Sequence, residues 1–315
     1  MTAMGPQIVA FNITSRCNLR CRHCYNDSGS GRQVDLPTEA LLGIAEEIRD
    51  LQPRQVCLCG GEPLLCPALF EIIACLRPHT EGLSLVSNGW CIDWEMAEKL
   101  VACGIDSIQI SLDGASPWQH DSLRGIAGAF HRAVRAITYL KKAGLPQVLT
   151  SLIPNRMNVR CVEDYFGLCS ALGVDRIRFM PLLALGRGRQ EMGELLPGAG
   201  EMFAFGRMFS RCRERYADRL QAEWDDPVGS SHYLYKFAVA QKKPVSLCIE
   251  ADGTVKLDMY MSFPVGNLKK TPLARLWQQE IPAAWQRPEV KECLENLQQM
   301  EDFSHLDFSW RVEDT

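Results

Sequence analysis

Three cysteines stand close together near the start of the sequence, in the stretch TSRCNLRCRHCYN at residues 14–26. Cys17, Cys21 and Cys24 are separated by four and then three positions. Thiolate sulfurs are soft ligands that bind zinc and iron–sulfur clusters, so this spacing indicates metal chemistry. The chain has 14 cysteines, and we expect the scattered ones to pack as small hydrophobic residues.

The clustered cysteines allow three interpretations. On a helix they would share one face as a buried stripe, although the Arg, His and Asn residues between them suit a core poorly. A zinc ion needs four ligands and His23 is present, but it adjoins Cys24 and the spacing is not that of a zinc ribbon. A [4Fe–4S] cluster on three thiolates would leave one iron without a protein ligand. We favour the cluster, whose open iron could bind a chelating substrate.

Small polar and acidic residues follow three expected strands. They are Gly60, Gly61 and Glu62 in CGGEP, Ser87, Asn88 and Gly89 in SNG, and Ser111, Asp113 and Gly114 in SLDG. Glycines let the backbone approach a ligand, and a carboxylate such as that of Glu62 can bind an ammonium group. Each segment alone is a turn signal. Because the carboxyl ends of parallel strands line one rim, the three together predict a ligand site.

Short apolar runs rich in β-branched residues alternate with amphipathic stretches over about the first 180 residues. The expected strands cover residues 8–14, 55–60, 83–88, 107–113, 147–153 and 176–181. Gly104 and Gly144 follow two of the helical stretches, where a left-handed cap is expected. This alternation predicts an α/β fold with a parallel sheet of right-handed βαβ units. Six such strands suit an open or incomplete barrel.

The pattern changes after about residue 190. We expect residues 199–223 to be helical and residues 247–259 to form a hairpin with Asp252 and Gly253 at its turn. The sequence therefore predicts two domains, which are a barrel core at residues 1–189 and a smaller lobe at residues 190–315.

Composition and charge are those of an ordinary soluble protein. Of 315 residues, 46% are hydrophobic and 23% are charged, and the net charge is -4. This balance gives no electrostatic footprint for nucleic acid. The sequence shows no secretory signal and no apolar run of about 18 residues, so we expect a cytoplasmic protein without membrane contact. About ten residues precede the first expected strand, and we expect no N-terminal peptide-recognition domain.

The motifs together resemble those of the radical S-adenosylmethionine (radical SAM) enzymes. The resemblance rests on CNLRCRHCY, GGEP, SNG, SLDG, HDSLRG and GRG, and it covers residues 7–189. It is strongest to the branch that contains peptide-modifying maturases and enzymes of haem d1 and alternative haem pathways. It implies a partial (β/α)6 TIM-type barrel with a small α+β C-terminal lobe. It also implies a [4Fe–4S] cluster on Cys17, Cys21 and Cys24, with S-adenosylmethionine on the open iron.

The resemblance assigns further residues to the bound S-adenosylmethionine. Gly60, Gly61 and Glu62 would contact its amino group, and Tyr25 would lie against the adenine. Its carboxylate would bind Arg124 or Arg132, between which the sequence does not decide. Four more residues would lie near the ribose or the methionine: Ser87, Asn88, Ser111 and Asp113.

The implied reaction is reductive cleavage of S-adenosylmethionine to a 5′-deoxyadenosyl radical, which removes a hydrogen atom from a substrate. A flavodoxin or ferredoxin would supply the electron. The substrate we expect is a ribosomal precursor peptide; the alternative is a porphyrin or another small molecule. A non-catalytic iron–sulfur electron carrier or regulator is the competing class, but such a protein would have no use for GGEP and SLDG at strand ends.

The C-terminal lobe resembles a SPASM or twitch extension, in which cysteines usually hold an auxiliary cluster. The matching residues are Cys248, Asp252, Gly253, Gly266, Asn267 and Trp277. Asp258 stands where a second cysteine is usual, and beyond residue 225 only Cys248 and Cys293 remain. We therefore expect a lobe that has lost its auxiliary cluster, the alternative being Asp258 as an unusual oxygen ligand.

Several other residues allow a structural and a functional interpretation. Cys57 and Cys59 lie two apart on a strand, hence on one face, and we expect them to pack in the core. His120 and Asp121, in a loop after the fourth strand, either form a turn and cap or contact substrate. The arginines at 187 and 189 lie in a solvated loop or bind an acidic substrate group. A core stripe is expected from residues at near-helical spacing: Met202, Phe205 and Phe209.

Overall fold

The computed structural model describes residues 5–31, 35–241, 244–260 and 263–298. The chain divides into two compact units that interleave along the sequence. Unit 1 comprises residues 1–16, 31–84 and 227–315, and unit 2 comprises residues 17–30 and 85–226. All six expected strands are present. The division into domains at residue 189 stays a prediction.

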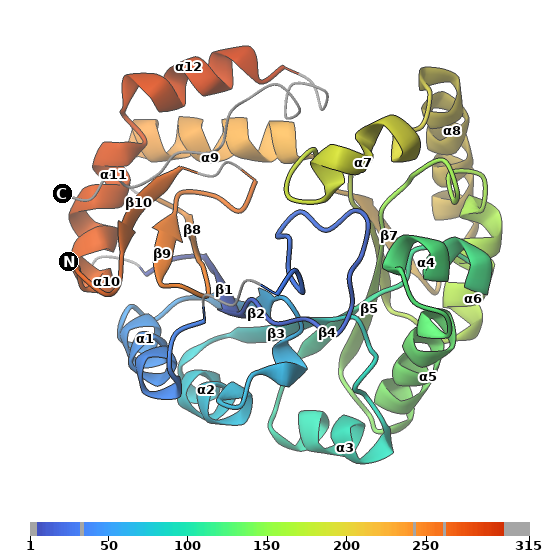
Figure 1. Cartoon of the computed structure of the whole chain (residues 1–315), viewed down its shortest axis with the longest axis horizontal. Helices are drawn as coiled ribbons and strands as arrows, with labels where there is room; N and C mark the ends of the chain where they lie inside the picture. The colour runs from blue at the N-terminus through green and yellow to red at the C-terminus, as the bar shows by residue number, and fades with distance from the viewer. Residues whose placement is uncertain (1–4, 32–34, 242–243, 261–262, 299–315) are drawn as a thin grey trace. The chain divides into compact units, whose positions relative to one another are not determined.

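Unit 1 is built around β1 (Ile8–Thr14), which is flanked by two parallel neighbours. These are β2 (Gln55–Gly60) and β8 (Ser246–Ile249). The sheet continues through antiparallel pairing from β8 to β9 (Thr254–Lys256) and from β9 to β10 (Pro264–Asn267) (Figure 1). The predicted hairpin is confirmed, with Gly253 in the left-handed region at φ +87°. Its first strand extends the sheet beside β1.

Alternation along β1 separates its two faces. Val9, Phe11 and Ile13 are fully buried, and Figure 1 shows helices α1 (Thr38–Asp50) and α2 (Leu69–Leu76) along one side of β1 and β2. Ala10 and Asn12 point to the other face, since side chains alternate along a strand. The remaining helices of unit 1 are α9 (Pro227–Gln241), α10 (Leu273–Arg275), α11 (Ile281–Ala284) and α12 (Pro288–Asn296).

Unit 2 contains four parallel strands in sequence order. They are β4 (Ser107–Ser111), β5 (Gln147–Leu152), β6 (Arg176–Phe179) and β7 (Gln221–Trp224). The chain enters this unit along β3 (Gly82–Ser87). Its helices are α3 (Trp94–Ala102), α4 (Pro117–Arg124), α5 (Ala129–Lys142), α6 (Val162–Ala171), α7 (Gly188–Leu195) and α8 (Ala199–Arg215).

The prediction of one helix over residues 199–223 is wrong at its end. Helix α8 stops at Arg215, and residues 221–224 form β7. The apolar stripe of the helix ends at the buried Cys212. The following segment pairs instead with the edge of β6, where Gln221 lies opposite Arg176. Pairing with the edge of β6 gives the backbone groups of this segment hydrogen-bond partners. A longer helix would have had no apolar face to pack at these residues.

An aromatic cluster forms the core between α6, α8 and β6. The ring of Phe179 lies 5.3 Å from those of Phe205 and Phe209, and 5.9 Å from that of Phe166. Phe205 and Phe209 are buried, which confirms the predicted core stripe at these positions, while Met202 is half-buried. Such rings supply much of the apolar area that a small unit buries.

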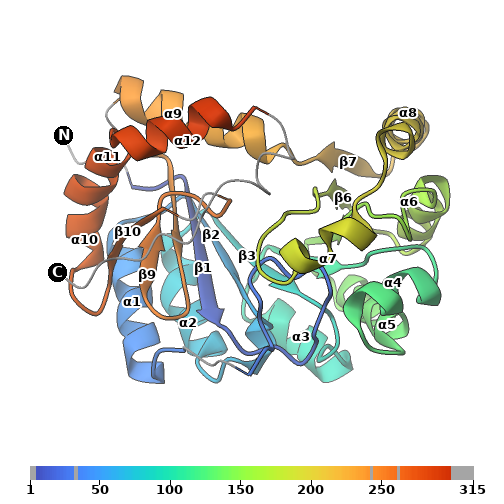
Figure 2. The same cartoon turned by 45° about the horizontal axis from the view of Figure 1, so that its top comes forward.

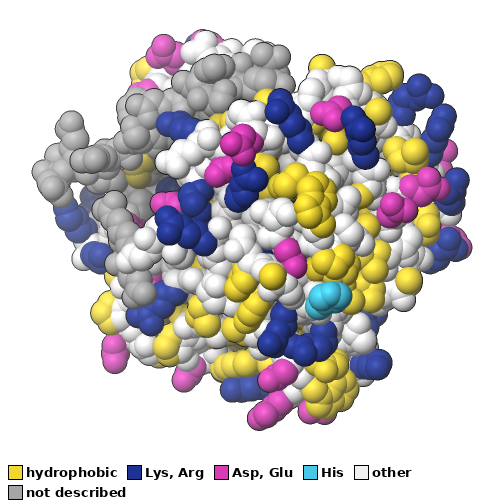
Figure 3. Space-filling model, turned by 45° about the vertical axis from the view of Figure 1, so that its right-hand side comes forward, with side chains coloured by type: hydrophobic (Ala, Val, Ile, Leu, Met, Phe, Trp, Pro, Cys, Tyr) yellow, Lys and Arg dark blue, Asp and Glu magenta, His cyan; other side chains and the backbone are white. Residues whose placement is uncertain are grey.

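Two features of the surface bear on function. On the face shown in Figure 3, basic and acidic side chains are interspersed, as expected from a net charge of -4. Among the described residues, no helix combines the length and the apolar character needed to cross a bilayer.

Replacing Phe205 by Ala is expected to lower the free energy of unfolding by about 3–5 kcal/mol, because the truncation leaves a cavity in the aromatic cluster. Urea denaturation followed by circular dichroism measures the change. The matched control is Phe203→Ala on the same helix, where the ring is 70% exposed and the expected change is within about 0.5 kcal/mol. Equal losses in the two variants would contradict the described packing of α8.

Candidate functional site

The three cysteines lie in an irregular loop of unit 2, residues 17–30, which we call the cysteine loop. It consists of turns and bends without a helix, so the interpretation as a helical core stripe is wrong. Cys21 is buried, and Cys17 and Cys24 are half-buried, all three as free thiols. The loop is therefore shaped by contacts with its surroundings rather than by internal helical hydrogen bonds.

The segment that follows β6 holds the cysteine loop. Arg187 Nε donates to Cys21 O at 2.9 Å, its Nη2 donates to Ser28 O at 2.8 Å, and its Nη1 pairs with Asp27 at 2.6 Å. Its backbone N donates to Cys24 O at 2.9 Å. Figures 1 and 2 both show this loop beside α7. Neither alternative predicted for Arg187 describes it, since its guanidinium fastens the loop.

The glycine before this arginine is required by the same contact. Gly186 has φ +53°, and a Cβ there would lie 2.5 Å from both Cys24 O and Tyr25 O. No side chain fits at that distance, so the GRG motif packs directly on the backbone of the cysteine loop. Arg189 is exposed and donates to Ala184 O at 3.2 Å.

Hydrogen-bond donors point at two of the cysteine sulfurs. The backbone N of Leu19 donates to Cys17 Sγ at 3.5 Å, and Asn88 Nδ2 lies 3.9 Å from the same sulfur. Arg124 Nη1 donates to Cys21 Sγ at 3.6 Å. Donors of this kind stabilise thiolates, which are the form that binds iron. The residues present therefore fit an iron–sulfur cluster.

Asp113 is the buried partner of Arg124. Arg124 Nε and Nη2 lie 2.7 and 2.5 Å from Asp113 Oδ2, and Ile153 N donates to Asp113 Oδ1 at 3.1 Å. Burial, the largest single effect, raises the pKa of Asp113, but the charge of Arg124, contributions from the two neighbouring histidines and the hydrogen bond from Ile153 N together bring the pKa below its ordinary value. The carboxylate is thus ionised and fixed from both sides.

Two histidines lie beside this pair. His120 Nδ1 accepts a hydrogen bond from Asp113 N at 3.0 Å, and His23 Nε2 lies 3.9 Å from Asp113 Oδ2. Burial lowers the pKa of His23 to about 3 and that of His120 to about 4. Both imidazoles are therefore neutral at neutral pH.

The HD pair has a structural role. His120 and Asp121 lie on helix α4 rather than in the predicted loop. The carboxylate of Asp121 accepts hydrogen bonds from Gly128 N and Phe130 N, each at 2.7 Å, at the start of α5. Of the two interpretations, the cap is the one that the geometry supports for this aspartate.

The GGE segment lies in unit 1 against the end of β1. Gly60 has φ +122°, and a Cβ at Gly61 would lie 2.1 Å from the carbonyl oxygen of Arg16, the residue before the first clustered cysteine. Both glycines are therefore required because this segment packs closely on the backbone of its own chain. From the sequence we expected them to let the backbone approach a ligand. Glu62 is fully buried; its N donates to Arg16 O at 2.8 Å and its carboxylate caps the 3₁₀ turn Pro63–Leu65.

The other predicted residues are spread over unit 2. The side chain of Asn88 donates to Asn18 Oδ1 at 2.9 Å, and Ser87 Oγ accepts from Gly89 N at 3.0 Å. Ser111 ends β4. Arg132 is exposed on α5 with its guanidinium carbon 5.3 Å from the centre of the Trp90 ring, and Tyr25 is 37% exposed. The structure thus brings the cysteine loop together with Asn88, Asp113 and Arg124.

A second polar group in unit 1 was missed by the sequence analysis. Asn12 Nδ2 donates to Cys248 Sγ at 3.5 Å and to Glu250 Oε2 at 3.1 Å, and Lys256 Nζ lies 2.6 Å from Glu250 Oε1. Burial raises the pKa of the Cys248 thiol well above its ordinary value. The only available signal was Asn12 itself, a polar residue in an otherwise apolar strand.

The same face of the sheet carries the two strand cysteines. Cys57 lies opposite Ala10, and Cys59 lies opposite Asn12. Cys248 flanks Ala10 from the other side, on β8. Because the parallel strands are in register, these thiols share one face, as predicted for Cys57 and Cys59.

Asp258 is engaged by its own unit. Ser231 Oγ donates to one carboxylate oxygen at 2.9 Å and Tyr260 N donates to the other at 2.6 Å. Both oxygens therefore have hydrogen-bond donors, and the aspartate fastens α9 to the segment after β9. Over the described ranges, no three His, Cys, Asp or Glu side chains converge as the ligands of a single ion do; the ligands of a cluster each bind a different iron atom.

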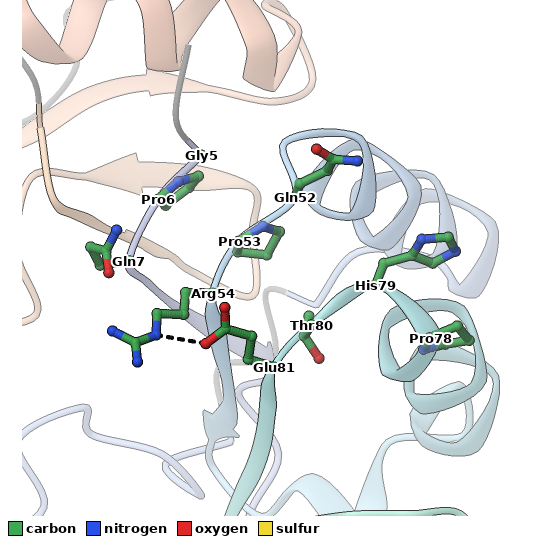
Figure 4. Close-up of a pocket in the computed structure, with 10 residues that line it drawn as sticks. All are labelled: Gly5, Pro6, Gln7, Gln52, Pro53, Arg54, Pro78, His79, Thr80 and Glu81. Atoms are coloured by element: carbon green, nitrogen blue, oxygen red, sulfur yellow. Dashed lines mark hydrogen bonds and ion pairs between the residues drawn. The ribbon is translucent and has the colours of Figure 1, made fainter. Parts of the chain in front are cut away.

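A separate hollow lies at the other ends of the strands of unit 1 (Figure 4). It measures about 480 Å³ and is lined by residues 5–7, 52–54 and 78–81, which precede β1, β2 and β3. Arg54 and Glu81 form an ion pair there at 2.7 Å. Ligands of parallel α/β sheets bind at the carboxyl ends of the strands, so this hollow is not the candidate site.

The family model of the radical SAM superfamily matches residues 11–168, half of the chain. The chain therefore belongs to this superfamily. It is 34% identical to the mycofactocin maturase MftC of Mycobacterium ulcerans over 200 residues, which is 64% of this chain and 54% of that protein. It is 28% identical to the pre-heme d1 synthase of Dinoroseobacter shibae, over 86% of this chain and 72% of that protein. The chain thus spans about half the length of the maturase.

The fold is also similar to that of solved structures. SuiB of Streptococcus suis, in a crystal structure with its precursor peptide SuiA, has a TM-score of 0.70 at 12% identity, over 88% of this chain and 65% of SuiB. The structure of SuiB bound to S-adenosylmethionine has the same TM-score over 96% of this chain. This likeness confirms the predicted α/β partial TIM-type barrel.

Replacing Arg187 by Ala is expected to loosen the cysteine loop by about 2–3 kcal/mol, because three side-chain contacts to it are lost. Hydrogen–deuterium exchange of peptides covering residues 17–30 should accelerate by about 30- to 150-fold. The control is Arg189→Ala, two residues away; its guanidinium donates to Ala184 O, outside the cysteine loop, and its loss should leave exchange unchanged. Similar exchange in the two variants would show that Arg187 does not fasten the loop.

Proposed function

We propose that this chain is a radical SAM enzyme that reductively cleaves S-adenosylmethionine and removes a hydrogen atom from a substrate. When bound, the cluster supplies the electron for that cleavage, and the resulting 5′-deoxyadenosyl radical takes the hydrogen. The observation that carries the proposal is the cysteine loop of unit 2. Of its three free thiols, Cys17 receives N–H donors from Leu19 and Asn88, and Cys21 receives one from Arg124.

The proposed cluster ligands are Cys17, Cys21 and Cys24, and the proposed number of clusters is one. The contacts of two residues support a single cluster. The Asp258 carboxylate is occupied by Ser231 and Tyr260 N, and the Cys248 sulfur receives Asn12 Nδ2. Either residue would have to leave these partners to bind iron.

Contacts within unit 2 favour Arg132 over Arg124 as the partner of the S-adenosylmethionine carboxylate. Arg124 is buried and already serves Asp113 and Cys21, whereas Arg132 is exposed and rests on the Trp90 ring. A planar guanidinium on an aromatic face is preorganised for a carboxylate. The half-exposed Tyr25 remains the proposed partner of the adenine.

The remaining roles follow the family resemblance. The Gly60–Glu62 segment is proposed to contact the amino group of S-adenosylmethionine. Three polar residues at strand ends are proposed to lie near its ribose or methionine: Ser87, Asn88 and Ser111. The contacts found for Asp113 support a different role for it, which is to hold Arg124.

The proposed substrate is a ribosomal precursor peptide, and a flavodoxin or ferredoxin in the cytoplasm is the proposed electron donor. The identity to the mycofactocin maturase supports the peptide. A porphyrin is the second candidate, because the match to pre-heme d1 synthase extends over 86% of this chain against 64% for the maturase.

The reconstituted protein is expected to bind about four irons per chain and to release 5′-deoxyadenosine with dithionite and S-adenosylmethionine. Cys24→Ala should reduce both to background, while Cys103→Ala, at the end of α3, should match the parent. Liquid chromatography with mass spectrometry measures the product. Deuterium from a labelled precursor peptide should enter the 5′-deoxyadenosine, and transfer from a labelled porphyrin instead would select the second candidate.

Three outcomes would count against these assignments. A cluster-loaded protein that forms no 5′-deoxyadenosine is not a radical SAM enzyme. About eight irons per chain would reveal a second cluster. Loss of activity in Cys103→Ala equal to that in Cys24→Ala would mean that thiol removal acts through folding.

Replacing Arg132 by Ala is expected to raise the Kd for S-adenosylmethionine by about 10- to 100-fold, because a charge-assisted hydrogen bond is lost. Isothermal titration calorimetry on the anaerobic protein measures it. Arg135, exposed one turn further along α5, is the control, and Arg135→Ala should bind as the parent does. If Arg124→Met weakens binding and Arg132→Ala does not, the two assignments must be exchanged.

A further inference from the structure

Arg124 places a positive charge at the sulfur of Cys21. The proposed contacts with S-adenosylmethionine do not use this charge. Its side chain is 9% exposed, so water screens it poorly. One face of its guanidinium fork binds Asp113, through Nε at 2.7 Å and Nη2 at 2.5 Å. The remaining arm, Nη1, donates to Cys21 Sγ at 3.6 Å. The fork therefore bridges a carboxylate and a proposed cluster ligand.

The backbone fixes this bridge in place. Arg124 is the last residue of α4, which ends at Gly125 with φ +76°, and a Cβ at Gly125 would lie 3.1 Å from Arg20 O. Arg22 N donates to Leu123 O at 2.9 Å. This hydrogen bond joins the residue after Cys21 to the residue before Arg124. The end of α4 and the cysteine loop are thus joined next to Cys21, and Arg124 needs no large movement to keep its contact.

Asp113 holds the guanidinium rather than cancelling it. Its other oxygen accepts from Ile153 N, and its carbonyl oxygen accepts from Asn158 Nδ2 at 2.9 Å. Both contacts of Arg124 to Asp113 go to a single oxygen, Oδ2, through Nε and Nη2, so Nη1 is left to face Cys21 Sγ. Within this group, the guanidinium of Arg124 is thus the charge that contacts Cys21 Sγ.

We propose that Arg124, held by Asp113, raises the reduction potential of the [4Fe–4S] cluster through its hydrogen bond and charge at Cys21 Sγ. Reduction adds one electron, taken from the external donor, and makes the cluster more negative. A fixed positive charge and an N–H donor at a ligand sulfur stabilise that reduced form, because hydrogen bonds to sulfur and local charge set cluster potentials. This inference rests on the proposed function, since it requires the cluster.

The test is a potentiometric titration of the reconstituted holoenzyme without S-adenosylmethionine, with the reduced cluster measured by electron paramagnetic resonance. In Arg124→Met, which removes the charge and the donor, the ratio of reduced to oxidised cluster at a fixed potential should fall at least tenfold. For a one-electron couple this is a downward shift of about 59 mV. Arg124→Lys, which keeps the charge on a shorter and single-pointed group, should shift less in the same direction.

The control is Arg22→Met. Arg22 adjoins Cys21 in the sequence, but its guanidinium pairs with Glu191 and Glu194. The reduction potential of the cluster in Arg22→Met should therefore stay at the parent value. Iron content and circular dichroism establish that each variant is loaded and folded. If Arg124→Met cannot be loaded, Arg124→Lys carries the test, and a parent-like potential in it would overturn the proposal.

The remaining outcomes also decide. An Arg124→Met variant that is fully loaded but titrates like the parent overturns the inference, as do equal shifts in Arg124→Met and Arg22→Met, because the effect would then belong to general surface charge. Failure of the parent protein to form a cluster at all would instead overturn the proposed function. The two failures are therefore distinguished within one experiment.

Discussion

The buried ion pair of Asp113 and Arg124 is the interaction on which the proposed active centre depends. A charge in a protein interior is tolerated only with a partner, and here each member also has a second contact. Asp113 binds Ile153 N at the end of β5, and Arg124 reaches Cys21 Sγ. The pair thus connects the carboxyl ends of two strands to an irregular loop that has no helix or strand of its own.

A second set of contacts closes the loop from the other direction. Arg187 binds carbonyl oxygens of the loop, and Gly186 lets the two backbones approach closely. A loop that must hold a cluster cannot rely on the cluster for its shape until the iron is bound. Fixed cations at its carbonyls and at one of its sulfurs prepare it beforehand, which is the preorganisation that sites built on loops otherwise lack.

Local signals in the sequence were enough for the strands and the hairpin turn, and they also supplied the proposed cluster ligands. Strand–helix alternation is a local pattern, and the spacing of Cys17, Cys21 and Cys24 has few chemical uses. The partners of buried charges are not a local pattern, so the sequence could not show that Asp113 and Arg124, which stand 11 positions apart, bind each other. The strand β7 was missed because short polar strands such as QAEW are decided by an available sheet edge, here β6, rather than by their own sequence.

Cys248 stands alone in its part of the sequence, but in unit 1 it lies among polar and thiol side chains of the sheet. Its strand pairs with β1, and its thiol lies beside Asn12 and Glu250 on the face that carries Cys57 and Cys59. Within this sheet the Cys248 sulfur receives Asn12 Nδ2, and Asp258 fastens α9 through Ser231.

The central claim is that three cysteines hold a cluster whose fourth iron binds S-adenosylmethionine. Electron–nuclear double resonance of the reduced protein tests it most directly, using S-adenosylmethionine with a ¹⁵N label in its amino group. The account predicts a hyperfine coupling between the label and the cluster, which is absent when unlabelled S-adenosylmethionine is used. A reduced cluster that shows no coupling to the label, in protein shown to bind S-adenosylmethionine, would contradict it.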